Sequence, residues 1–375
     1  MSSSDDSYYG SYYFPGFSNA TATFWLRFEE VTDQIHTFTA FLNYYIAFPG
    51  FFLNILHFWI LTRKSMMTSS TNVIMIGICI CDLVAMADLM RIYVNIEVSL
   101  WKYTWPDAEC HPPDSYLSVV CSEISALSAF YFKRSATWLG VLLAAIRTLI
   151  VRNPTHRLAD SLASPQFGVL STVSTFLFSL PLPVLSNWNM SIRSIDTWMP
   201  APNCSGFPPN YTQPVFRSFT TNAIPTWDAT FYRFIPSVVF PLLTAVLLLE
   251  LQKARRRQKT LTISDAGGSR SPKTTRLVLW MSVSFVFAAA PQGVILLLLM
   301  VSNGYQGFIN ILIEMTAIFV LTDSINSISH VLIPFFMSTQ YRETVGASMK
   351  CVAQRAPRSK RRASPMPRHS FRAHF

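Results

Sequence analysis

Residues 72–97 read NVIMIGICICDLVAMADLMRIYVNIE, a run of mostly apolar side chains. A helix that crosses a bilayer needs about 20 consecutive, mainly apolar residues, and this run is long enough. Six further stretches of the same kind occur along the 375-residue chain. The predicted spans cover residues 38–62, 72–97, 116–150, 167–186, 230–252, 276–302 and 308–337. We therefore expect an all-α membrane protein with a seven-transmembrane helix bundle over 38–337.

The composition agrees with a membrane protein and argues against other classes. Half of the residues are hydrophobic and 13% are charged, against about 25% charged in soluble domains. No internal repeat is visible, whereas many transporters are built from repeated halves. His-Glu-x-x-His, Gly-x-Ser-x-Gly and paired catalytic carboxylates do not occur in the spans. We expect neither an enzyme nor a bound metal or cofactor.

Basic residues are concentrated in alternate connections between the spans. Lys and Arg gather in 62–71, 151–166, 253–276 and the tail after 338, while the N-terminal segment 1–37 carries acidic residues. The positive-inside rule then predicts an extracellular N-terminus and a basic cytoplasmic tail, 352–375, that is disordered. The first ten residues contain no apolar leader, so the first span is expected to direct its own insertion. The net charge of +10 indicates contact with anionic membrane lipids rather than nucleic acid.

N-glycosylation motifs give an independent indication of the same orientation. The sequons begin at Asn19, Asn189, Asn203 and Asn210, and all four fall on the predicted outer side. We expect a glycoprotein at the plasma membrane.

Four stretches carry a family resemblance. They are 72–82 (NVIMIGICICD), 138–154 (WLGVLLAAIRTLIVRNP), 274–293 (TTRLVLWMSVSFVFAAAPQG) and 326–345 (NSISHVLIPFFMSTQYRETV). With them the chain resembles a rhodopsin-like G-protein-coupled receptor over roughly residues 38–351. More narrowly, it is similar to the nematode serpentine receptor class W, which is related to receptors for FMRFamide-like and myosuppressin-like neuropeptides. The resemblance implies an extracellular ligand and a heterotrimeric G protein as partners.

The resemblance also implies an activation network inside the bundle. Asn54 and Asp82 occupy the positions of the family's polar pair. Asp82 then belongs to an activation network, or it only hydrogen-bonds to Asn54. Arg147 stands where the family has the Arg of an Asp-Arg-Tyr motif, but Ile146 precedes it. Arg147 therefore couples to the G protein, or it extends to lipid head groups as an interfacial side chain.

The last two spans keep the family frame with departures. Phe285 and Pro291 match, while Ala289 replaces the usual Trp. The seventh span lacks the family's usual Asn-Pro-x-x-Tyr motif. In its place stand the polar residues Asn326, Ser327 and His330, and the proline comes later, at Pro334. The frame is held by 340–342 (QYR), which resembles the start of an amphipathic eighth helix over 338–351. We therefore expect the family's fold, with an activation mechanism that differs in detail.

Charged residues inside the spans mark a candidate ligand pocket. Lys133 and Arg134 lie well within the third span, where bases are costly unless they are paired or face a wet cavity. Their candidate partners are Asp88, Glu97, Glu123 and Asp323. The bases form an internal ion-pair lock, or they line a pocket where ligand charges replace these pairings.

The predicted outer mouth is acidic and aromatic. It comprises Trp101, Tyr103, Trp105, Asp107, Glu109, Tyr116, Trp188, Trp198, Asp228 and Glu314. Carboxylates could bind the guanidinium of an amidated peptide, and rings could pack on its aromatic residue. The same aromatic residues could instead form an interfacial belt.

Cysteines and the cytoplasmic side suggest modification sites. Cys204 in the long outer loop pairs with Cys110 or, alternatively, with Cys121; a loop position in divergent peptide receptors favours Cys110. Cys351, beyond the eighth helix, suits palmitoylation, and Ser364 follows a basic pair that suits a kinase. The basic loop 253–276 is where the family engages a G protein.

These observations lead to three functional hypotheses. The first is a receptor for a short amidated neuropeptide that activates a G protein. The second is a chemoreceptor of the same fold for an environmental small molecule. The third, a transporter or channel, lacks the expected repeats and charge rings.

Overall fold

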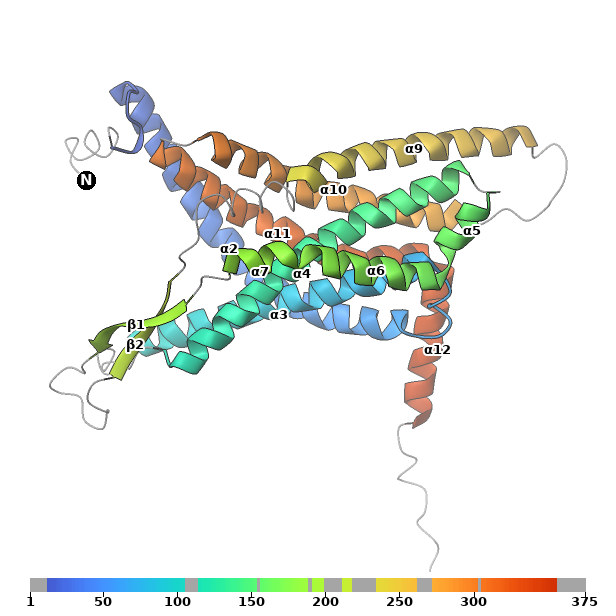
Figure 1. Ribbon diagram of the computed structural model, residues 1–375, viewed down its shortest axis with the longest axis horizontal. Coiled ribbons are helices and arrows are strands. Elements are labelled where there is room, and N and C mark those ends of the chain that lie inside the picture. Colours follow the sequence, from blue (N-terminus) through green and yellow to red (C-terminus); the bar gives the residue numbers. More distant parts are fainter. Residues whose placement is uncertain are drawn as a thin grey trace, which may run out of the picture.

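Seven helical segments make up the body of the protein (Figure 1). The computed structural model describes residues 12–104, 114–153, 156–187, 191–198, 211–217, 234–261, 272–302 and 305–355. The seven segments in this part are long and apolar enough to cross a membrane. They are α2 (Asn19–Leu61), α3 (Ser70–Thr104), α4 (Tyr116–Arg152), α6 with α7 (Pro165–Ser179 and Pro181–Asn187), α9 (Ile235–Leu261), α10 (Pro272–Val301) and α11 (Gln306–Met337). The predicted all-α, seven-helix membrane bundle is confirmed.

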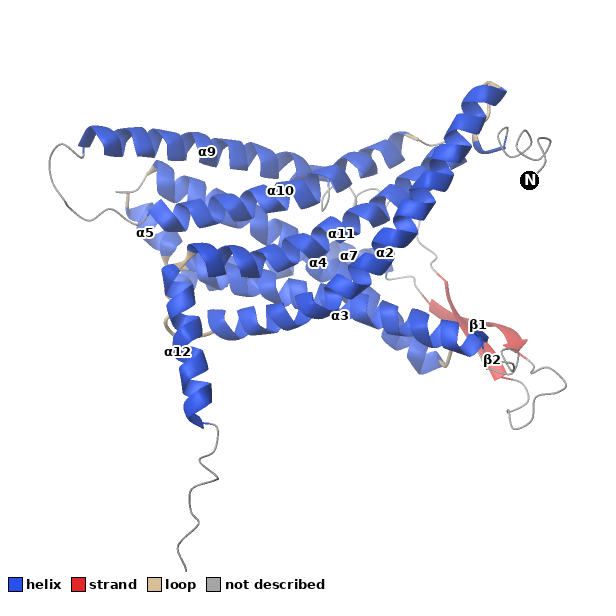
Figure 2. Ribbon diagram, turned by 180° about the vertical axis from the view of Figure 1, so that it is seen from behind, coloured by secondary structure: helices blue, strands red, loops and turns tan. Residues whose placement is uncertain are grey.

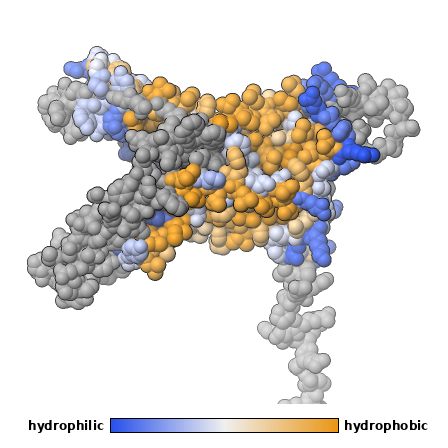
Figure 3. Space-filling model, in the orientation of Figure 1, coloured by the Kyte–Doolittle hydropathy of each residue, from blue (hydrophilic) through white to orange (hydrophobic). Residues whose placement is uncertain are grey.

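The surface of the bundle agrees with a membrane setting. Hydrophobic residues cover its middle, and hydrophilic residues gather towards its two ends (Figure 3). We refer to the end that holds Asn19 and Gln306 as the outer end. The inner end holds Leu61, the short helix α5 (Arg157–Ala163) and the last helix, α12 (Thr339–Arg355).

The first helix is much longer than the span predicted at 38–62. It begins at Asn19 because the Ser18 hydroxyl caps it, accepting a hydrogen bond of 3.3 Å from the backbone N–H of Thr21. Charged residues between 27 and 33 ended the apolar run but did not stop the helix, because α-helices tolerate exposed charges. From residue 19 onward, the N-terminal segment expected over 1–37 is helical and continuous with the first span.

The fourth span is interrupted, and prolines explain where. Helix α6 ends at Ser179, and α7 begins at Pro181, which has no N–H to continue the helical hydrogen bonds. Helices α2, α9, α10 and α11 instead continue through internal prolines at 49, 241, 291 and 334. Near Pro291 the Ser237 hydroxyl donates to the carbonyl of Ala289 at 3.1 Å. Such side-chain bonds help to keep proline-containing spans stable.

Helix α12 runs across the inner end of the bundle (Figure 2). It is anchored by Tyr341, which is 1% exposed and whose hydroxyl is 2.8 Å from Nδ1 of His57 on α2. Burial raises the pKa of Tyr341 above its ordinary value. The predicted eighth helix over 338–351 is confirmed and extends to Arg355.

A β-hairpin at the outer end was not predicted. Strand β1 (Ser191–Trp198) pairs antiparallel with β2 (Tyr211–Arg217), with Ser191 opposite Arg217 and Trp198 opposite Tyr211. The hairpin lies beside the outer end of α4 (Figure 1). It adds a small two-stranded sheet to the helical bundle.

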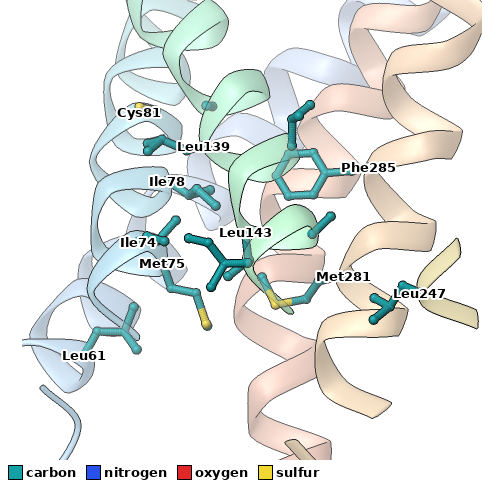
Figure 4. Close-up of a cluster of buried hydrophobic side chains, with 14 of the residues drawn as sticks. Leu61, Ile74, Met75, Ile78, Cys81, Leu139, Leu143, Leu247, Met281 and Phe285 are labelled. Atoms are coloured by element: carbon teal, nitrogen blue, oxygen red, sulfur yellow. The ribbon is translucent and has the colours of Figure 1, made fainter. Parts of the chain in front are cut away.

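The apolar core fills the inner half of the bundle (Figure 4). Leu139 and Leu143 of α4 pack between α3 and α10, where Ile78 and Met281 are also buried. Gly140 allows a close approach, because a Cβ there would lie 2.9 Å from the ring of Phe240. This core joins α4 to α9 and α10 in the inner half of the bundle.

Candidate functional site

A cavity of about 480 Å³ lies between α3, α4, α10 and α11. Asp82 and Ser327 line its inner part, and Leu299 and Ile313, near the outer ends of α10 and α11, also line it. Much of the remaining lining is apolar. A cavity with a few convergent polar groups in an apolar lining is the usual form of a ligand site.

An ion pair crosses this cavity. Nζ of Lys133 on α4 lies 3.1 Å from Oδ2 of Asp323 on α11. Nε2 of Gln292 on α10 donates to the same Oδ2 at 2.9 Å and to the carbonyl oxygen of Phe319 at 3.2 Å. Arg134 also lines the cavity. Side chains of α4 and α10 thus both contact one carboxylate of α11. Of the four predicted candidates, Asp323 is the partner of Lys133.

Asp88, another predicted partner, belongs to a separate network. Its Oδ1 accepts from Arg91 one turn further along α3, at 2.8 Å and 2.9 Å, and from the Ser125 hydroxyl at 2.9 Å. Arg91 also donates to the Ser122 hydroxyl at 2.6 Å. The pairing of Asp88 with Lys133 is therefore wrong, and Asp88 does not line the cavity. It fastens α3 to α4 instead.

The remaining predicted pocket residues lie elsewhere. Glu97, Glu123 and Glu314 do not line the cavity. Glu314 accepts a hydrogen bond from the Thr32 hydroxyl of α2. Trp198 lies on β1, where the described structure covers the backbone but not this side chain. Among the described mouth residues, Tyr116 and Glu314 do not line the cavity. The mouth residues Trp105, Asp107, Glu109, Trp188 and Asp228 lie outside the described residues.

The floor of the cavity contains two buried polar pairs. Nδ1 of His330 on α11 is 2.8 Å from Oδ2 of Asp82 on α3. Nδ2 of Asn54 on α2 donates to the carbonyl of Gly50 at 2.9 Å and to the Ser327 hydroxyl at 3.1 Å. The alternative hydrogen bond between Asn54 and Asp82 is thus not formed. Both residues are instead tied to α11.

Aromatic and hydroxyl contacts extend this floor towards α9 and α10. The ring of Phe285 lies between Phe240, with centroids 5.2 Å apart, and His330, with centroids 4.4 Å apart. Asn326 accepts a hydrogen bond from the Ser284 hydroxyl of α10. Predicted network residues on α2, α3 and α10 therefore each contact α11 or, for Asn326, lie on α11 and contact α10. Pro291 lies two turns further out on α10 and is not among these contacts.

Several polar residues that bridge helices were not predicted from the sequence. Ser284, Gln292 and the pair Ser324–Asn43 bridge helices, as does His57 at the inner end. The available signal was their polarity within apolar spans, because such side chains usually face the bundle interior.

Arg147 lies at the inner end of α4, half-buried between the buried residues Ile146 and Thr148. The Thr148 hydroxyl donates back to the carbonyl of Ala144 at 2.8 Å. This places a guanidinium at the inner face of the bundle, five residues before the end of α4 at Arg152.

The predicted modification sites are placed only in part. Cys121 is an exposed thiol on α4 and forms no disulfide among the described residues. Asn19 is exposed at the first position of α2, and Cys351 lies on α12, where only the backbone is described. The other predicted sites lie outside the described residues: Cys110, Cys204, Asn189, Asn203, Asn210 and Ser364.

Comparison with known proteins identifies a family for this architecture. Residues 41–352 match the family model described as serpentine type 7TM GPCR chemoreceptor Srw. The chain is also similar to Sex peptide receptor-related protein 2 of Caenorhabditis elegans, at 28% identity over 232 residues. That match covers 57% of this chain, which spans about half (51%) of the length of the curated relative. With seven spans around a polar-floored cavity and a family match over most of its length, the chain belongs to the Srw family of serpentine seven-transmembrane G-protein-coupled chemoreceptors.

Proposed function

We propose that this receptor binds a short amidated peptide from outside the cell and activates a heterotrimeric G protein. The observation that carries the proposal is the continuity of the cavity with its polar floor. The same cavity is lined by Lys133 and Asp323 and, deeper, by Asp82 and Ser327. A ligand that contacts the first pair can therefore bias contacts that tie α3 and α2 to α11.

The peptide assignment rests on the relative and on the chemistry of the cavity. The relative is named a sex peptide receptor-related protein, and the cavity combines charged groups with apolar walls. The family description, chemoreceptor, supports the second candidate, an environmental small molecule. Both candidates require the same transmembrane signalling, so the ligand screen has to contain both classes.

The proposed orientation has an extracellular N-terminus at the plasma membrane. It is supported by the basic connections 62–71, 151–166 and 253–276, which also suit anionic lipids. Glycosidase treatment is expected to shift the gel mobility of the wild-type chain. A variant lacking the sequon residues Asn19, Asn189, Asn203 and Asn210 is expected to show no shift. A shift in that variant would argue against the assigned sites.

Further modifications belong to the same proposal. We expect a disulfide between Cys110 and Cys204 on the outer side, palmitoylation of Cys351 at the end of α12 and phosphorylation of Ser364 in the tail. Mass spectrometry of the purified receptor, with and without reduction, tests all three.

The coupling role of Arg147 gives the decisive functional test. Cells that express the chain with a promiscuous G protein are screened with amidated peptides and small molecules. Arg147→Ala is expected to abolish the response at unchanged surface expression. The matched control is Arg152→Ala, which removes an exposed base one turn further along α4 and is expected to keep the response. A purified protein that moves a solute across vesicles, with no signalling to any ligand, would overturn the receptor assignment.

A further inference from the structure

The carboxylate of Asp323 is engaged on one side only. Lys133 and Gln292 both approach Oδ2, at 3.1 Å and 2.9 Å. Within the described residues Oδ1 has no hydrogen-bond partner, and Asp323 lines the cavity with its side chain 26% exposed. A carboxylate accepts through both oxygens. One acceptor is therefore left for a ligand.

Lys133, in turn, has hydrogen-bond donors that the ion pair does not use. An ammonium group carries three donors, and the ion pair with Asp323 uses one of them. Its side chain is 36% exposed and lines the cavity. The pair thus presents a hydrogen-bond acceptor next to hydrogen-bond donors while its two charges remain matched.

The charges around this pair discriminate between ligand groups. A ligand carboxylate placed at Oδ1 would meet the like charge of Asp323. A ligand guanidinium or ammonium would compete with Lys133 and leave that base without its counter-charge, with Arg134 also nearby in the lining. A neutral primary carboxamide has both an N–H donor and a carbonyl acceptor. It can satisfy both residues without breaking the ion pair.

We propose that the cavity recognises a neutral primary carboxamide on its ligand. Asp323 Oδ1 accepts from the amide N–H, and Lys133 Nζ donates to the amide carbonyl. An adjoining apolar group of the ligand packs among Leu296, Leu299 and Val320, which line the same cavity. This inference rests on the proposed function, because it assigns the amidated end of the peptide to this pair.

The test uses two small probes that differ in one group, N-acetyl-phenylalanine amide and N-acetyl-phenylalanine. Binding to the purified full-length receptor is measured by ligand-observed NMR, which detects weak association. The amide is expected to bind about tenfold to a hundredfold more tightly than the acid, the range for one hydrogen bond to a charged group. Equal affinity, or preference for the acid, overturns the inference.

Variants identify the residue responsible. Asp323→Asn removes the negative charge and supplies a donor, so it is expected to abolish or reverse the preference for the amide. Lys133→Met is expected to weaken amide binding. The matched control is Asp88→Asn, a carboxylate of α3 that does not line the cavity, and it is expected to keep the preference. An unchanged preference in Asp323→Asn also overturns the inference.

Failure of this inference can be told apart from failure of the proposed function. If amidated peptides activate the cells and their free-acid forms are equally potent, the proposed peptide receptor is supported and the proposed carboxamide site is overturned. If no peptide activates but the wild-type receptor prefers the amide probe in an Asp323-dependent way, the site stands and the natural ligand is another amide.

Discussion

The contacts between α2 and α11 differ in kind from those between α9 and α10. Polar pairs bind α2 to α11 at levels from the outer end to the cavity floor: Glu29 with Asn310, Thr32 with Glu314, Asn43 with Ser324 and Asn54 with Ser327. Helices α9 and α10 meet mainly through apolar side chains, including Phe240 stacked on Phe285. Figure 1 shows both pairs in the same bundle.

The difference indicates which half of the bundle can move. Hydrogen bonds in an apolar setting are directional and lose their value when a helix shifts. Apolar contacts are not directional, so they tolerate small displacements better. We infer that α2, α3 and α11 form a fixed frame and that signalling movements occur in α9 and α10.

The largest expected effect comes from the buried pair that joins α11 to α3. His330→Phe removes the hydrogen-bond partner of Asp82, and a buried polar group left without its partner costs about 1–3 kcal/mol, more when it is charged. Thermal unfolding of the purified receptor should show a large drop in melting temperature. Adding Asp82→Asn in the same chain should recover part of it, because no buried carboxylate is then left unpaired. A melting temperature equal to that of the wild type would argue against a fixed frame.

An intermediate effect is expected at the outer end of the frame. A Cβ on Gly307 would lie 2.2 Å from the buried ring of Phe14, so Gly307→Ala overpacks the cluster that also holds Trp25 and Phe308. Overpacking costs about 1–3 kcal/mol. In a double-mutant cycle, Gly307→Ala should cost less in the Phe14→Ala background than in the wild type, because the ring that its Cβ would meet is then gone. Gly346→Ala is the matched control, because nothing lies within 4 Å of its Cβ position.

The smallest effect on stability is expected between the mobile helices. Ser237→Ala removes the hydrogen bond to the carbonyl of Ala289, which is worth about 0.5–1.5 kcal/mol. Because this bond links α9 to α10, its loss should raise basal signalling in the cell assay while the melting temperature changes little. A drop as large as that of His330→Phe, with unchanged signalling, would contradict the division into fixed and mobile halves.

Hydropathy predicted the number and most of the bounds of the spans, because the spacing of charges reports directly on membrane crossing. It missed the outer half of α2, where the charges around Arg27 and Glu30 end the apolar run although the helix continues. It also missed the β-hairpin, whose strands lie in a long polar loop.

Within the site, sequence identified the polar residues but not their pairing. Lys133 had four candidate partners because the rotation of each helix about its axis is set by packing, not by local sequence. A hydrogen bond between Asn54 and Asp82 was one of two alternatives, yet the side-chain partner of Asn54 is Ser327, 273 residues away. Such long-range pairings depend on the assembled bundle.

The polar face of α2 has a consequence for the biosynthesis of the receptor. Asn43, Asn54 and His57 enter the membrane with the first helix, but their partners follow 281, 273 and 284 residues later. At about 5–20 residues per second, translation of that distance takes roughly 15–55 s. During this interval these side chains lack their later partners on α11 and α12, so the first helix needs protection in the translocon until those two helices arrive. Truncated chains that lack α11 should therefore be early targets of quality control.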